Sequence, residues 1–218
     1  NEEDYQVAKS FHLRGKAYKI PGVGIDVKEI HDLKVDRAQK RRELGVPEDA
    51  FVMLSVGDLI PRKNHIVALR AFAQVNIPNS YYLLCGNGEL KEMLQEESRK
   101  LNVADRVIFL GFRSDVREIL HAVDLFCFPS LQEGLPVSLM EAMAAGVPCI
   151  ASRIRGNVDL MENGELLFEA GNIGEVQQRI ENILFHVSER EKKKSIAKYS
   201  KEKVTEKMRE IYNAISSR

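Results

Sequence analysis

Two glutamates, Glu133 and Glu141, lie eight positions apart around a loop that leads into a predicted helix. We expect this helix to begin near Pro136, since proline has no amide hydrogen to leave unpaired in a first helical turn. A carboxylate at either end of an anion site suits a ligand whose phosphates lie between two sugars. The alternative interpretation, that both residues are ordinary surface glutamates, explains this placement less economically. The free amides at a helix start, with the helix dipole, form such a site. The amides expected to point outward belong to Gly134, Leu135, Val137 and Ser138.

Further candidate residues follow other apolar runs, where predicted strands end. Arg62 and Lys63 come after Gly57 and just before a predicted helix, so two cations could meet a phosphate there. The next run is followed by Gly-Asn-Gly, which is neither the dinucleotide fingerprint nor a P-loop and by itself predicts only a tight turn. Gly86 is the first residue after this run. The apolar run that follows it is succeeded by a glycine, an aromatic residue and a cation, namely Gly111, Phe112 and Arg113.

Composition excludes several classes of protein. The 218 residues include 32 Lys plus Arg and 32 Asp plus Glu, so the net charge is zero, which argues against a nucleic-acid partner. No apolar run approaches the ~20 residues of a membrane-spanning helix, and the first residues do not resemble a signal peptide. The three cysteines are scattered and form no C-x-x-C pair, which argues against disulfides and a cysteine metal site and fits a reducing compartment. The chain also has no Asp-x-Asp, the simplest pair of carboxylates for a divalent metal.

Short apolar runs alternate with amphipathic helical stretches along the chain. Most of the runs are hydrophobic throughout, as strands covered on both faces are. This alternation predicts an α/β fold with a Rossmann-like, doubly wound parallel sheet, in which ligands bind at the carboxyl ends of the strands. An apolar stripe within 204–215 predicts a final helix. The predicted strands are residues 17–20, 51–56, 81–85, 107–110, 125–128, 148–151 and 166–168.

The combination of motifs resembles the retaining glycosyltransferases of family 4. Glu133 and Glu141 form an E-x7-E motif within PSLQEGLPVSLMEAMAAGVPCIAS, preceded by VGDLIPRKNHIVALRAFA and VIFLGFRSDV, and the phrase IPGVGID at 20–26 is similar to bacterial capsular or exopolysaccharide enzymes. The resemblance implies the carboxyl-terminal, donor-binding half of a GT-B fold. On this basis we expect a residual linker at 1–14, a donor-binding domain at 15–187 and a charged helical segment at 188–218.

The resemblance also implies a role for each matching residue. Glu141 would bind the ribose of the nucleotide, and Glu133 would contact the donor sugar. Lys63 would neutralise the leaving diphosphate and, with Glu133, forms the implied catalytic pair, so no metal and no other cofactor is expected. A UDP-sugar donor is implied on family grounds. The implied donor-binding residues are Gly57, Arg62, Lys63, Gly86, Gly111, Phe112, Arg113, Glu133, Gly134, Leu135, Val137, Ser138 and Glu141.

One position departs from the family pattern. Many members have arginine where this chain has Asp58, so one of two usual phosphate-facing cations is replaced by an anion. Arg62 is nearby in sequence, but we expect its side chain to start on a different side of the loop from Lys63. Lys63 is therefore expected to carry most of the contact with the diphosphate.

These observations favour the donor half of a metal-independent hexosyltransferase that serves surface polysaccharide synthesis. The acceptor, a glycan or a lipid-linked sugar, would bind to an amino-terminal domain that this chain lacks, so the chain alone should not transfer sugar. We expect a cytoplasmic location, with peripheral association of the full-length protein at the inner membrane face as an alternative. Two other functions remain open, namely a non-catalytic nucleotide-sugar-binding module and an unrelated dehydrogenase or epimerase, although the lack of G-x-G-x-x-G counts against the latter.

Overall fold

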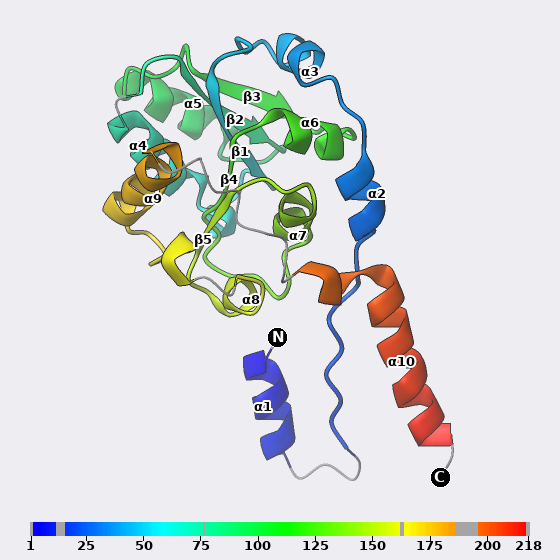
Figure 1. Cartoon of the computed structure of the whole chain (residues 1–218). Coiled ribbons are helices and arrows are strands. Elements are labelled where there is room, and N and C mark those ends of the chain that lie inside the picture. The colour runs from blue at the N-terminus through cyan, green and yellow to red at the C-terminus, as the bar shows by residue number, and fades with distance from the viewer. Residues whose placement is uncertain (1, 12–15, 76, 162–163, 186–195, 217–218) are drawn as a thin grey trace.

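A six-stranded parallel sheet forms the centre of the protein, in the order β3-β2-β1-β4-β5-β6 (Figure 1). The computed structural model describes residues 2–11, 16–75, 77–161, 164–185 and 196–216. The first strand, β1, lies in the middle of the sheet, the next two run outward to β3, and β4 returns beside β1 to build the other half, which confirms the doubly wound prediction. The strands are β1 Phe51–Val56, β2 Ser80–Cys85, β3 Val107–Gly111, β4 Leu125–Phe128, β5 Cys149–Ser152 and β6 Leu167–Phe168.

Helices cover both faces of this sheet and create two separate apolar cores. One core lies under α2 Val27–Asp32, α3 Arg37–Glu43, α6 Val116–Ala122 and α7 Val137–Ala144. The other lies under α4 His65–Gln74, α5 Lys91–Lys100 and α9 Ile173–Phe185. The remaining elements are α1 Glu2–Ser10, α8 Arg155–Val158, α10 Lys201–Ser216 and 3-10 turns at Pro61–Lys63, Gly164–Leu166 and Ile196–Tyr199.

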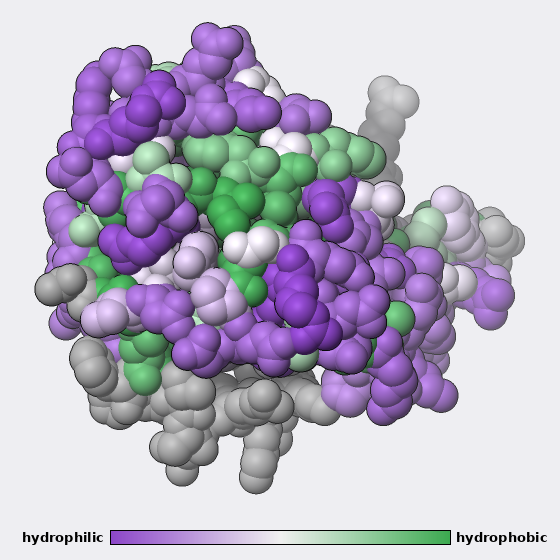
Figure 2. Space-filling model, turned by 90° about the horizontal axis from the view of Figure 1, so that it is seen from above, coloured by the Kyte–Doolittle hydropathy of each residue, from purple (hydrophilic) through white to green (hydrophobic). Residues whose placement is uncertain are grey.

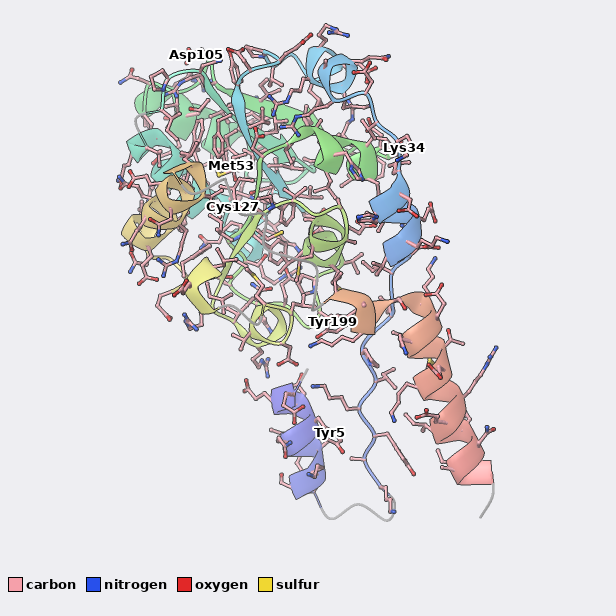
Figure 3. The ribbon with its side chains drawn as sticks, viewed as in Figure 1. Tyr5, Lys34, Met53, Asp105, Cys127 and Tyr199 are labelled. Carbon is pink, nitrogen blue, oxygen red and sulfur yellow. The ribbon has the colours of Figure 1, made fainter. Side chains whose placement is uncertain are left out.

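Burial on both faces explains why the strands are hydrophobic without alternation. In β1, Val52 and Leu54 point into one core while Met53 between them points into the other, as expected from the two-residue period of a strand. Met53 and Cys127 lie together at the centre of the domain on the paired strands β1 and β4 (Figure 3). The outer surface seen from above is mostly hydrophilic around one apolar patch (Figure 2). Six predicted strands are confirmed to within one residue at each end.

The predicted strand at 17–20 is wrong. These residues are extended, but they lie outside the sheet, and Tyr18 and Ile20 are exposed. A β-branched or aromatic run forms a strand only when another strand pairs with it, and here the backbone passes beside α1 and α10 instead (Figure 1). Further along this segment, the backbone of Ile25 forms an isolated parallel β-bridge with Ser200.

Both ends of the chain form helices beyond the sheet. Helix α1 occupies most of the segment expected to be a linker, and residues 1 and 12–14 of that segment lie outside the described residues. The predicted final helix is confirmed as α10, in which Val204 is buried while Met208, Tyr212 and Ile215 are exposed. Figure 1 shows α1, the extended segment and α10 together below the sheet domain.

The loops after β1, β2 and β3 are joined by backbone contacts at the carboxyl edge of the sheet. The Gly57 amide donates to Cys85 O at 2.9 Å, and the Gly86 amide donates to Gly111 O at 2.8 Å. Gly86 has φ +145°, and a Cβ built on it would lie 2.1 Å from Gly57 O. The absence of a side chain at Gly86 therefore allows the first two loops to meet.

We predict that Gly86→Ala destabilises the protein by about 3 kcal/mol, because a backbone carbonyl cannot move aside for the new methyl group. Urea unfolding followed by circular dichroism measures this loss. The matched control is Gly174→Ala in α9, where a Cβ would meet its nearest atom at 3.6 Å and no loss is expected. Equal unfolding midpoints for the two variants would contradict the assignment of Gly86 as a packing position.

Candidate functional site

The candidate site lies where the strand order reverses, between β1 and β4. The loops that follow these two strands are joined by the Leu131 amide, which donates to Arg62 O at 2.8 Å. The second loop leads into α7, which begins at Val137 and so starts near Pro136, as predicted, although Pro136 is the N-cap and not part of the first turn. No side chain caps this helix start, so its first amides are available to an anion.

Lys63, Arg62 and Glu133 meet in this space. Lys63 Nζ lies 2.7 Å from Glu133 Oε1, and Arg62 Nη1 lies 2.9 Å from the same oxygen. The side chains of Lys63 and Glu133 are only 14% and 12% exposed, so water screens their attraction weakly. Lys63 Nζ also stands 5.3 Å above the Phe128 ring, which adds a cation–π contact.

The side chains of Arg62 and Lys63 start on different sides of the turn, as expected, but their charged ends meet at Glu133. Both residues belong to the 3-10 turn Pro61–Lys63, in which neighbouring side chains leave the backbone about 120° apart. The long Arg62 side chain nevertheless returns to Glu133, and its Nη1 also donates to Gln132 O at 2.9 Å. Two cations therefore share one carboxylate oxygen.

Two glycines leave room for this arrangement, because a side chain at either position would meet neighbouring atoms. A Cβ on Gly57 would lie 3.3 Å from both Cδ and Cε of Lys63, so the glycine clears the path of the lysine side chain. A Cβ on Gly156 would lie 2.5 Å from Gly134 O, which shows how closely α8 approaches the loop before α7. Gly134 itself has open space where its Cβ would be.

The start of α7 is fixed by contacts from two other segments of the chain. Leu135 packs over Gly22, where a Cβ would lie 2.2 Å from Leu135 Cδ2. The Ser138 hydroxyl donates to Val56 O at 3.4 Å and so links the helix to the end of β1. Val137 is exposed beside them. The four residues predicted to supply amides thus lie on one anchored turn.

Glu141 lies in α7 and is paired with a cation that the sequence did not single out. Arg117 Nε donates to Glu141 Oε1 at 3.1 Å, and Arg117 Nη1 donates to Glu29 Oε1 at 3.0 Å. All three residues line a groove of about 460 Å³ between α2, α6 and α7. The sequence signal that could have identified Arg117 is its position in the first turn of α6, just after the loop that contains Arg113.

The loop after β3 presents an aromatic side chain rather than a cation. Phe112 is 80% exposed. Arg113 forms two hydrogen bonds with Asp115, at 2.7 and 2.6 Å, and Lys40 donates to the same carboxylate. The Arg113 guanidinium holds the pKa of Asp115 well below its usual range. The Arg113 charge is therefore already neutralised.

His65 is a buried residue that the sequence analysis did not place in the site. Its Nε2 lies 3.2 Å from Asp58 O, so the neutral ring must carry its proton on Nε2 to donate there. Its Nδ1 is buried and has no hydrogen-bond partner within the described residues. Burial lowers the pKa of His65 to about 4. The uncharged ring supports the loop that carries Lys63.

The described ranges contain no group of three or more His, Cys, Asp and Glu side chains that could hold a metal ion. The three cysteines are free and buried. No helix in the same ranges has the length and apolar character needed to cross a bilayer.

Comparison with known proteins gives consistent results. Residues 36–203 match the family described as glycosyl transferases group 1. The chain is 30% identical over 226 residues to the putative glycosyltransferase EpsD of Bacillus subtilis, covering 98% of this chain and 59% of that protein. It is 32% identical over 168 residues to the Escherichia coli UDP-Gal:alpha-D-GlcNAc-diphosphoundecaprenol alpha-1,3-galactosyltransferase, covering 75% of this chain and 43% of that protein.

Solved structures share the fold. Anabaena Alr3699/HepE in complex with UDP and glucose superposes with a TM-score of 0.71 at 27% identity, over 89% of this chain and 56% of that one. Sucrose-phosphate synthase from Thermosynechococcus elongatus reaches a TM-score of 0.79 at 22% identity, over 99% of this chain and 56% of that one. This chain therefore spans about half the length of each of these four proteins.

We predict that His65 makes the folded state acid-sensitive. Because its pKa is lower in the folded than in the unfolded state, the unfolded chain binds more protons between about pH 6.5 and pH 4, so stability falls as the pH drops through this window. From pH 7 to pH 5 the loss from this residue is about 2 kcal/mol. Urea unfolding at both pH values measures it.

His65→Gln is the control for this effect, because its amide can still donate to Asp58 O but does not titrate. The variant should lose about 2 kcal/mol less than the wild type between pH 7 and pH 5. The same pH dependence in both proteins would rule out His65 as the source.

Proposed function

The chain belongs to the group 1 glycosyltransferases, and we propose that it is the donor-binding part of a retaining enzyme that transfers a hexose from a UDP-sugar. The acceptor would be a glycan or a lipid-linked sugar in surface polysaccharide synthesis. The observation that carries this proposal is the meeting of Lys63 and Arg62 beside the uncapped start of α7. Cations and helix amides converging at one point suit a diphosphate.

The diphosphate would bind against Lys63 and the first amides of α7. Lys63 is mostly buried, so its charge acts at short range with little screening. Arg62 is more exposed and would add a second, weaker contact. Both cations already contact Glu133, so a bound diphosphate would compete with this carboxylate for them. The Glu133 oxygens would then be released toward the hydroxyls of the donor sugar.

The nucleoside would lie along the groove beside Glu141. A carboxylate can accept hydrogen bonds from two neighbouring hydroxyls, which suits the ribose. The exposed Phe112 ring, at the turn after Gly111, would border the base, and backbone groups of this turn would read its edge. UDP is our proposal for the nucleotide because HepE, at 26–27% identity, was solved with UDP and with UDP-glucose.

Bond breaking would rely on fixed charges. Negative charge grows on the diphosphate as the glycosidic bond breaks, and Lys63 together with the start of α7 would stabilise it without a metal ion. Glu133 would hold the reacting sugar beside this leaving group. The retaining course, which keeps the anomeric configuration, rests on the E-x7-E resemblance.

We propose that the acceptor binds through a further domain. The chain spans about half the length of its relatives, and apolar side chains are exposed on the segments below the sheet domain. Phe11, Val23 and Tyr212 are examples.

A binding module without catalysis would share the same donor contacts, and sugar transfer by the longer protein would exclude this alternative. Transfer by this chain alone would contradict the need for another domain.

Calorimetry with UDP, GDP and ADP tests the donor assignment. We expect UDP to bind at least roughly tenfold more tightly than the other two, with the same affinity in EDTA. A preference for GDP or ADP would overturn the choice of uridine. Failure of all three nucleotides to bind would overturn the proposed function.

We predict that Lys63→Ala weakens UDP binding by roughly ten- to a hundredfold, the usual loss for a charge-assisted hydrogen bond. Arg62→Ala should cost less than about fivefold, because solvent screens the exposed guanidinium. The control Lys100→Ala removes an exposed lysine paired with Glu96 on α5 and should leave binding unchanged. Unchanged UDP affinity in Lys63→Ala would show that Lys63 does not contact the diphosphate.

A further inference from the structure

Arg117 joins carboxylates from two other helices. It lies in the first turn of α6 and donates from Nε to Glu141 on α7 and from Nη1 to Glu29 on α2. Glu141 is only 16% exposed, whereas Glu29 is 61% exposed. The Arg117 guanidinium thus spans the groove from its protected wall to its open edge.

The contact with Glu141 leaves one side of that carboxylate open. Arg117 holds Oε1, and Oε2 has no hydrogen-bond partner within the part of the chain that the structure describes. A glutamate side chain has several rotatable bonds, and fixing it at the moment of binding costs affinity. A planar guanidinium, which donates in a fixed direction, can fix the carboxylate in advance.

We infer that Arg117 is a positioning residue that orients Glu141 toward the ribose hydroxyls of the donor. Oε2 accepts from one hydroxyl, and the second lone pair of Oε1 remains for its neighbour. This inference rests on the proposed function, which gives Glu141 the ribose, and adds to it a residue that acts through Glu141 rather than on the ligand.

The exposed contact of Arg117, with Glu29, should contribute less to ligand binding than its contact with Glu141. An ion pair between exposed side chains typically has little net effect, so the contact between Arg117 and Glu29 should matter little for binding. If Arg117 served only to tie the helices together, its loss would change stability without changing which nucleotide is preferred. The preference for a ribose over a deoxyribose therefore separates a positioning role from a purely structural one.

The experiment compares UDP with 2′-deoxyUDP by calorimetry on the intact chain. We expect the wild type to prefer UDP by roughly tenfold, and Glu141→Gln to lose most of this preference. Arg117→Ala should weaken UDP binding by about fivefold and reduce the preference to about twofold. Arg117→Lys, which keeps the charge but not the fixed fork of donors, should fall between Arg117→Ala and the wild type.

Two controls accompany these variants. Lys100→Ala removes an exposed lysine that pairs with Glu96 on α5, and Arg70→Ala removes an exposed arginine that pairs with Glu97 on the same helix. Both should keep the wild-type preference. Thermal unfolding of every variant identifies any loss of folded protein, and Arg117→Lys provides the comparison if Arg117→Ala unfolds.

The outcomes separate the positioning role of Arg117 from the proposed function. If Glu141→Gln loses the preference for UDP while both Arg117 variants keep it, the positioning role is wrong and the proposed function stands. If the wild type binds UDP and 2′-deoxyUDP equally, the ribose role of Glu141 is wrong and the inference fails with it. Loss of the preference in Arg117→Ala, with partial recovery in Arg117→Lys, supports the positioning role.

Discussion

The site depends on the reversal of strand order between β1 and β4. Parallel strands direct all their carboxyl ends to one edge of the sheet, and at the reversal the loops that follow β1 and β4 become neighbours. The backbone bond from Leu131 to Arg62 fixes these loops together. Lys63 and Glu133, which are 70 residues apart, then meet at 2.7 Å. Neither loop could form the site alone.

Close packing around glycines makes this convergence possible. The chain approaches itself at Gly22, Gly57, Gly86 and Gly156, where a methyl group would meet neighbouring atoms at between 2.1 and 3.3 Å. The contacts at Gly22 and Gly156 hold the turn before α7, Gly57 clears the path of Lys63, and Gly86 lets the loops after β1 and β2 meet. The glycines thus act together by letting separate loops share one small volume.

The charges of the site are balanced locally, in a chain whose net charge is zero. Glu133 lies against two cations, and Glu141 lies against Arg117, which also reaches Glu29. An anionic ligand therefore meets an arrangement of paired groups and must exchange partners with them. This favours recognition of a particular shape of anion over general attraction to negative charge.

The sequence by itself determined the sheet segments and the start of α7, because burial on both faces leaves continuous apolar runs and Pro136 suits a helix start. It could not exclude the strand at 17–20, since a strand exists only with a partner. Only the tertiary structure decided that Arg62 turns back to Glu133, that His65 is buried, and that Arg117 holds Glu141 from 24 positions away. Such contacts join residues from different elements, and local patterns contain no information about which elements pack together.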